Sequence, residues 1–138
     1  TAEIRRVHQF NVFTVNSAAQ HALAEFLREP PRYEALPAFF AAKRDLLRAA
    51  LTDTPLELLP CEGSYFQLAR YGRVSDEPAG EFAQRLVREI GVATIPLSPF
   101  YQAPPRHSLL RLCFAKREET LRGAAGRLLA FDAGRAMR

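Results

Sequence analysis

The chain has 138 residues, of which 48% are hydrophobic, and this length is enough for one buried core but not for two. Its 19 basic and 15 acidic residues give a net charge of +4, but the basic residues stand in scattered pairs, as on a solvated surface, so we do not expect a nucleic-acid partner. Because no apolar run is long enough to cross a bilayer and the first residues lack the apolar core of a signal peptide, we expect no membrane association.

Helices are predicted for the first part of the chain. Residues 17–20 have the spacing of a capping box, and the helical period that follows ends at Pro30–Pro31. A second helix is predicted from Tyr33 to Leu51, where apolar side chains fall near one stripe. We therefore expect one short and one long helix before the first strand.

Strands and helices are mixed in the rest of the chain. The residue patterns predict strands at 56–59, 64–71, 92–95 and 109–114, a helix at 81–90, a proline-rich loop at 96–105 and a closing helix from Glu118. This mixture favours an α+β fold, with a small, mostly antiparallel sheet of three to four strands covered by helices, over a doubly wound parallel sheet.

The usual catalytic groupings are missing from the sequence. His8, His21 and His107 stand far apart, so we expect no metal site. Two cysteines, Cys61 and Cys113, have no metal-ligand spacing and are too few for a disulfide framework, which favours buried free thiols in the cytoplasm. Since no phosphate-binding loop or nucleophile motif occurs either, we expect no self-sufficient active site and no catalytic residue within this chain.

Arg111 stands out because it lies inside the otherwise apolar strand 109–114. Burying a guanidinium is costly unless an anion meets it, and its planar fork suits a carboxylate. Strand alternation puts Leu110, Leu112 and Phe114 on one face and Arg111 on the other. An ordinary strand arginine that points to solvent or pairs with a structural acid is the alternative.

Four segments in order resemble the small domain of class I and II aminotransferases of fold type I, in the branch of the methionine and kynurenine aminotransferases. They are residues 6–9 with Val12–Phe13, residues 59–66, residues 92–101 and residues 110–115. Together they span most of the chain. The resemblance implies a full-length enzyme that depends on pyridoxal 5'-phosphate (PLP), forms a homodimer, and transfers an amino group from a methionine-like or aromatic amino acid to a 2-oxo acid.

The resemblance also implies roles for particular residues. It assigns Arg111 to the α-carboxylate of the substrate, and the stretch from Ile95 to Ser98 to a loop at the mouth of the active site. It places Phe13 in the substrate pocket of a neighbouring subunit, although packing of Phe13 in the core is an equal alternative. Residues 60–66 resemble a turn and strand beside the substrate, where Gly63 suits a tight backbone, and a plain turn before a strand explains them at least as well.

The family's PLP-binding lysine has no counterpart here, because neither Lys43 nor Lys116 has the family's surroundings. We therefore expect residues 1–30 to form a helical entrance segment with an interdomain helix, and residues 31–138 to form the small domain. The large PLP-binding domain would precede Thr1, so we expect this fragment to bind no cofactor and to be inactive alone. A free-standing binding domain that keeps the fold without catalysis is the alternative.

Overall fold

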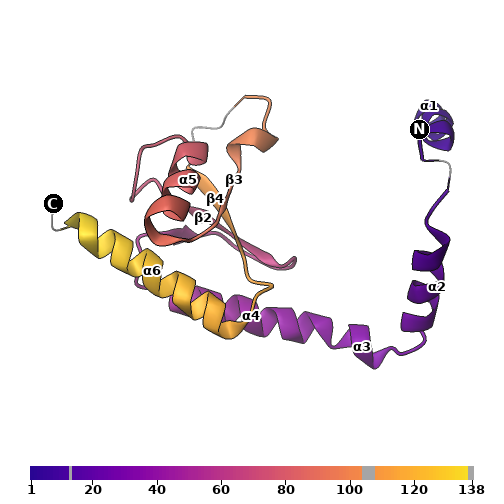
Figure 1. Cartoon of the computed structure of the whole chain (residues 1–138), viewed down its shortest axis with the longest axis horizontal. Helices are drawn as coiled ribbons and strands as arrows, with labels where there is room; N and C mark the ends of the chain where they lie inside the picture. The colour runs from indigo at the N-terminus through magenta and orange to yellow at the C-terminus, as the bar shows by residue number, and fades with distance from the viewer. Residues whose placement is uncertain (13, 104–107, 137–138) are drawn as a thin grey trace. The chain divides into compact units, whose positions relative to one another are not determined.

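The structure is a computed structural model that describes residues 1–12, 14–103 and 108–136 (Figure 1). The chain divides into two compact units, residues 1–37 and residues 38–138. The first unit is helical. Its helices are α1 (Ala2–Asn11), α2 (Ser17–Phe26) and α3 (Pro31–Glu34), and none of their described side chains is buried.

The second unit is built on a four-stranded sheet of order β1-β2-β4-β3. The strands are β1 (Glu57–Leu58), β2 (Phe66–Arg70), β3 (Ile95–Pro96) and β4 (Leu109–Cys113). Every neighbouring pair is antiparallel, and the β2–β4 pair at the centre is the longest, running from Phe66 opposite Cys113 to Arg70 opposite Leu109. The predicted α+β class with a small antiparallel sheet is therefore confirmed.

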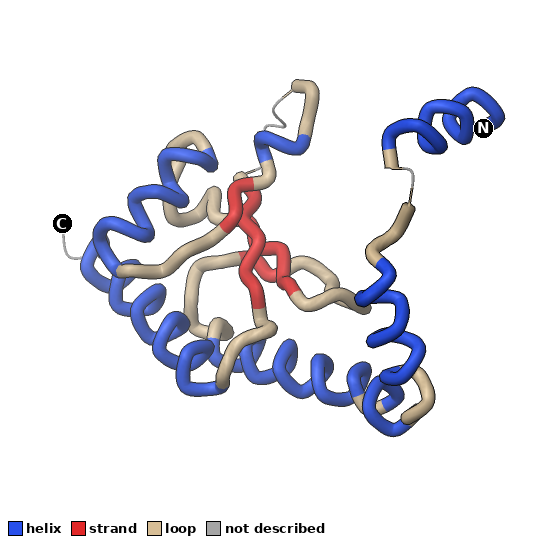
Figure 2. Tube along the Cα trace, turned by 45° about the vertical axis from the view of Figure 1, so that its right-hand side comes forward, coloured by secondary structure: helices blue, strands red, loops and turns tan. Residues whose placement is uncertain are grey.

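Three helices accompany the sheet, and α4 and α6 run along the same side of it in both views (Figures 1 and 2). They are α4 (Leu36–Ala50), α5 (Ala79–Ile90) and α6 (Glu118–Ala136). One apolar cluster joins them to the sheet, and its larger members are Leu47, Leu51, Tyr71, Phe82, Leu86, Leu110, Leu112, Phe114, Leu121 and Leu128. Its burial against a single sheet face is the main stabilising contribution that the fold shows.

Two helix boundaries differ from the prediction for local reasons. Helix α2 is capped by Asn16, whose side chain accepts a hydrogen bond from the Ala19 N–H, and Ser17 is the first helical residue. The predicted helix from Tyr33 to Leu51 is interrupted at Ala35. Pro37 explains the interruption, because its ring clashes with the carbonyl four residues earlier and it has no N–H to donate.

The third strand lies later in the chain than predicted, at Ile95–Pro96 instead of residues 92–95. Helix α5 ends at Gly91, which has a left-handed φ of 64°. The Gly91 N–H donates to Val87 and the Val92 N–H to Leu86, so Val92 completes the helix cap and cannot pair in the sheet. Pro96 is tolerated because β3 is an edge strand.

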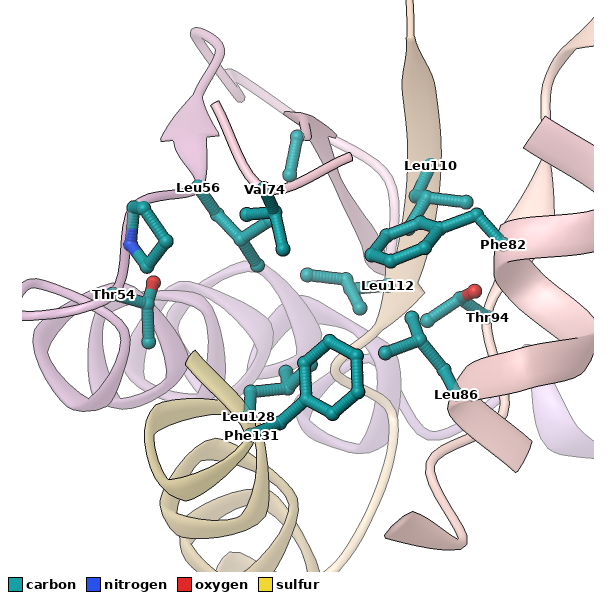
Figure 3. A pocket seen from close by; sticks show the side chains of 12 residues that line it. Thr54, Leu56, Val74, Phe82, Leu86, Thr94, Leu110, Leu112, Leu128 and Phe131 are labelled. Atoms are coloured by element: carbon teal, nitrogen blue, oxygen red, sulfur yellow. The ribbon is translucent and has the colours of Figure 1, made fainter. Parts of the chain in front are cut away.

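A small cavity lies in the core between the sheet, α5 and α6 (Figure 3). It measures about 10 Å³, which is near the lower limit for one water molecule. Thr54 and Thr94 lie at opposite ends of it and the other labelled side chains around it are apolar. The Thr54 hydroxyl donates to the Leu51 carbonyl at 2.7 Å, whereas the buried Thr94 hydroxyl has no partner in the described part of the chain. The two threonines therefore provide a natural comparison of satisfied and unsatisfied hydroxyls.

Candidate functional site

The two faces of the sheet differ in their surroundings. Gln67 and Ala69 of β2 and Leu110 and Leu112 of β4 are all buried on the core side. Because side chains alternate along a strand, residues of opposite parity lie on the other side. We call that side the open face, and its residues are Phe66, Leu68, Ile95, Arg111 and Cys113. These five residues remain partly accessible or exposed, so this part of the face can receive another group, whereas Leu109, which has the same parity at the start of β4, is buried.

Arg111 lies in the middle of β4, on the open face as the alternation predicted. It stands opposite Leu68 of β2 on one side and opposite Ile95 of β3 on the other. Its neighbours Leu110 and Leu112 are buried, which fixes the parity of the strand. The structure therefore supports the guanidinium from the most firmly paired strand of the sheet.

The Arg111 guanidinium lies close to two aromatic rings. Its central carbon is 4.7 Å from the centroid of the Phe66 ring and 6.0 Å from that of Phe100. Within the described residues it has no acidic partner, in contrast to Arg70 on β2, which pairs with Glu57 at 3.4 Å. Within the described residues Arg111 therefore forms no structural ion pair, which was one of the two alternatives to a carboxylate-binding role.

Aromatic contacts leave the hydrogen-bonding capacity of this arginine intact. A guanidinium over a ring is attracted through its face, whereas its five N–H donors lie in its plane. Two parallel N–H groups remain able to bind both oxygens of a carboxylate. The rings also lower the local polarity, which strengthens a charged hydrogen bond. Arg111 is thus chemically suited to hold a carboxylate in a fixed orientation.

Phe66 is held by its own strand and by the turn before it. Its ring meets the Tyr65 ring edge-on, with centroids 5.6 Å apart and an interplanar angle of 85°. In the turn, Ser64 and not Gly63 has the left-handed backbone, with a φ of 70°. The interpretation that Gly63 supplies the special geometry is therefore wrong: a β-carbon built on Gly63 has nothing within 4 Å.

Phe100 reaches Arg111 from a different element. After β3 the chain forms a short 3-10 helix, Ser98–Phe100, and the Leu97 N–H donates to the Leu109 carbonyl at 3.2 Å. This bond extends the pairing of β3 with β4 by one residue and leads the chain across the end of β4. Phe100 itself is 66% exposed. One ring beside Arg111 is thus carried by a strand and the other by a loop.

Phe13, Lys43, Lys116 and Cys113 were also singled out in the sequence. Phe13 lies outside the described residues, so its predicted role stays a prediction. The Lys43 ammonium donates to the Lys116 carbonyl at 2.6 Å and lies 4.9 Å from the Phe39 ring centroid. Cys113 is exposed on the open face, so the prediction of a buried thiol is wrong for this residue. No described group of three His, Cys, Asp or Glu side chains could hold a metal ion.

The contacts of Phe66 and Phe100 with Arg111 could not be predicted from the sequence. The register that places β2 beside β4 pairs residues that are 39 (Arg70 and Leu109) to 47 (Phe66 and Cys113) positions apart, and no local pattern encodes it. Phe66 in the predicted strand 64–71 was the available signal, because a long aromatic side chain can reach a diagonal neighbour on the adjacent strand. Nothing in the sequence around Phe100, apart from its place in the proline-rich loop, predicts its contact with Arg111.

Together these features define an α+β domain that presents one arginine, flanked by aromatic rings, on the open face of a small sheet. The sequence model of the family described as aminotransferase class I and II matches residues 2–128. The chain belongs to this family. Among the described residues, no helix is both long and apolar enough to cross a membrane.

Known relatives carry the same fold. The chain is 56% identical over 129 residues to the methionine aminotransferase of Escherichia coli, covering 93% of this chain and 33% of that protein. Kynurenine–oxoglutarate transaminase 1 of Rattus norvegicus is 29% identical over 147 residues, 91% of this chain and 35% of that one. A solved structure of an E. coli methionine aminotransferase superimposes with a TM-score of 0.82 at 55% identity, covering 94% of this chain and 34% of its own. The chain therefore spans about a third of the length of these relatives.

Proposed function

We propose that this chain is the C-terminal part of a PLP-dependent aminotransferase that moves an amino group from an amino acid to a 2-oxo acid. Arg111 would bind the α-carboxylate that both substrates share. The observation that carries this proposal is the guanidinium stacked on Phe66, with its donors free of acidic partners in the described part of the chain. The family membership and the 56% identity to a methionine aminotransferase support it.

The amino donor in this proposal is methionine or a similar apolar amino acid. The high identity to the E. coli methionine aminotransferase favours methionine, and the more distant kynurenine transaminases keep an aromatic donor open. The open face supports an apolar side chain as well, because Leu68 and Ile95 stand opposite Arg111 on its two sides and present hydrocarbon there.

PLP supplies the electron-withdrawing chemistry of amino transfer when it is bound, and proteins hold it through a lysine. Lys43 and Lys116 are the only lysines of the chain. The Lys43 ammonium is bonded to a backbone carbonyl and stacked on Phe39, and Lys116 supplies that carbonyl. The residues of this chain do not fit PLP by themselves, so we propose that the lysine lies outside these 138 residues and that the chain alone is inactive.

Further parts of the proposal concern the organisation of the whole protein. We place the small domain at residues 31–138 and a helical entrance segment with an interdomain helix at residues 1–30, and we expect a cytoplasmic homodimer in which Phe13 reaches the neighbouring pocket. The exposed apolar side chains Ile4, Val7 and Phe10 of α1 support a segment that meets another surface. Light scattering of the complete protein should give the mass of a dimer, and a monomer at micromolar concentration would contradict this part.

Replacing Arg111 in the complete protein that contains this chain tests the proposed role. Arg111→Lys keeps the charge but loses the fork, and Arg111→Gln loses both. For Arg111→Gln we expect kcat/KM for methionine to fall by about 30-fold to 1000-fold, equivalent to roughly 2–4 kcal/mol, because a charged hydrogen-bonded pair is lost. The kcat/KM of Arg111→Lys should lie between those of the wild type and Arg111→Gln.

A matched control and a carboxylate-free ligand make the result specific. Arg88→Gln changes an exposed arginine of α5 and should leave kcat/KM unchanged. An amine that matches methionine but lacks the carboxylate should bind the wild type and both Arg111 variants with the same affinity. Unchanged kcat/KM in Arg111→Gln, or an equal loss of affinity for the amine, would refute the carboxylate role.

A further inference from the structure

We propose that Phe66 is a positioning residue that holds the Arg111 guanidinium in the orientation in which it meets the substrate carboxylate, with Phe100 as a second, weaker support. This inference rests on the proposed function of Arg111. Phe66 would touch neither the reacting atoms nor the carboxylate. It would act through Arg111 alone, and this distinguishes it from a residue that selects substrates by direct contact.

The β2–β4 ladder makes the Phe66–Arg111 contact a fixed one. Phe66 stands opposite Cys113, and Leu68 stands opposite Arg111, so Phe66 and Arg111 are diagonal neighbours on the open face. Long side chains reach across such a diagonal. Both residues belong to five-residue strands that are paired along their whole length, so the ring and the guanidinium stem start from backbone positions that cannot slip independently.

An arginine without a partner would sample many rotamers. Ordering its side chain costs conformational entropy, and a ligand must meet that cost if the protein does not. In the described part of the chain no carboxylate holds Arg111, and Phe66, at 4.7 Å, is the nearer of the two rings that it contacts. Stacking therefore orders the guanidinium before the ligand arrives and leaves its in-plane donors available.

Phe100 differs from Phe66 in what carries it. It follows an edge strand of two residues, it is two-thirds exposed, and its ring centroid is 6.0 Å from the guanidinium. A more distant ring on a loop contributes less to positioning than a closer ring on a paired strand. The two aromatics should therefore give unequal effects when each is replaced.

The test uses kinetics of the complete protein with four variants at these aromatics. Phe66→Leu removes the ring face and keeps an apolar side chain, Phe66→Tyr keeps the ring face, and Phe100→Leu removes the weaker support. Phe39→Leu is the matched control, because it removes another cation–aromatic contact, that with Lys43 at 4.9 Å, away from the open face. Phe66→Met is a second ringless variant in case Phe66→Leu does not fold.

We expect Phe66→Leu and Phe66→Met to raise KM for the amino acid and for the 2-oxo acid by about fivefold to thirtyfold, as for the loss of a partly desolvated cation–aromatic contact. The value of kcat should change little. Phe66→Tyr should restore KM to the wild-type value, Phe100→Leu should give a smaller rise, and Phe39→Leu none. An amine without a carboxylate should bind all variants equally.

A double-mutant cycle with Arg111→Lys separates this inference from the proposed function. If Phe66 acts through Arg111, Phe66→Leu should have no further effect on KM in the Arg111→Lys background. The same rise in both backgrounds would make Phe66 merely structural and overturn the inference, and so would a wild-type KM in both ringless variants. If Arg111→Lys itself leaves KM unchanged, the proposed carboxylate role fails first, whatever Phe66 does.

Discussion

Thr54 and Thr94 line one cavity and differ in whether the hydroxyl has an acceptor. Valine has the shape of threonine without the polar group, so replacement removes only the hydroxyl. We expect Thr94→Val to raise the free energy of unfolding by about 1 kcal/mol, because a buried hydroxyl without a partner is costly. Thr54→Val should lower it by about 1 kcal/mol, since it breaks a bond to Leu51.

Urea unfolding of the two variants beside the wild type measures both changes at constant m-value. We expect the two changes in the free energy of unfolding to have opposite signs, because neither substitution alters the volume of the side chain or the shape of the cavity. A loss of stability in Thr94→Val would show that its hydroxyl is paired, for instance with a water molecule in the cavity, and would contradict the assignment.

Tyr71 makes stability sensitive to alkaline pH. Burial raises the pKa of its phenol, whose O–H donates to the Glu77 carbonyl at 2.7 Å. The unfolded chain releases this proton near pH 10, roughly the ordinary value for tyrosine, while the folded chain still holds it. Unfolding then releases a proton, so the free energy of unfolding must fall as pH rises above about 10.

Replacing this tyrosine tests the assignment. Tyr71→Phe should be less stable at neutral pH by about 1 kcal/mol, because it loses the hydrogen bond. Its free energy of unfolding should fall less steeply than that of the wild type above about pH 10. Chemical unfolding of both proteins across this pH range measures the free energy of unfolding against pH, and equal slopes above about pH 10 would refute the assignment.

At the residue scale, the sequence predicted what depends on neighbours in the chain. Arg111 could be found because a charged residue interrupts an apolar strand, and its face followed from alternation. Its contacts with Phe66 and Phe100 could not be found, because they depend on strand order and register. Residues 16 and 17 show the same limit locally: Asn16 and Ser17 are both good caps, and the choice of Asn16 depends on backbone geometry.

At the scale of elements, helix α5 is capped at its C-terminus by Gly91, a position that requires glycine. Gly91 has a φ of 64°, which costs a residue with a β-carbon about 1–2 kcal/mol. A β-carbon there would also come within 3.3 Å of the Arg127 guanidinium. Thermal unfolding should therefore show Gly91→Ala destabilised by about that amount.

A second glycine of the same helix provides the control. A β-carbon built on Gly80 meets nothing within 4 Å, and the residue lies inside the helix. Gly80→Ala should raise stability by up to about 1 kcal/mol, since alanine is the better helix former. If both substitutions change stability in the same direction, the left-handed backbone is not the cause.

Helices of this chain were easier to predict than its edge strands. The period of α5 and the start of α6 are visible in the sequence, because many residues repeat one pattern. The edge strands β1 and β3 have two residues each, too few for a period, and their position depends on which neighbour they pair with. The order β1-β2-β4-β3 likewise arises from contacts between distant segments.

At the scale of the whole molecule, the core belongs to one of the two units. All residues of the apolar cluster and its surroundings lie between Phe40 and Phe131. Removal of residues 1–30 should therefore leave the Tm of the chain within about 2 °C, which corresponds to less than roughly 0.5 kcal/mol. Calorimetry of the chain with and without this segment measures the difference, and a fall of ten degrees would show that residues 1–30 stabilise the second unit.

Strand β4 joins stability and binding in a way that limits how this sequence can vary. Leu110 and Leu112 belong to the core while Arg111 faces outward, so loss or gain of one residue within 109–113 would turn the guanidinium inward and expose a leucine. Natural length variation should therefore be confined to the flanking loops. An aligned relative with a gap inside this strand would have lost both the outward position of the arginine proposed to bind the carboxylate and the packing of the hydrophobic core.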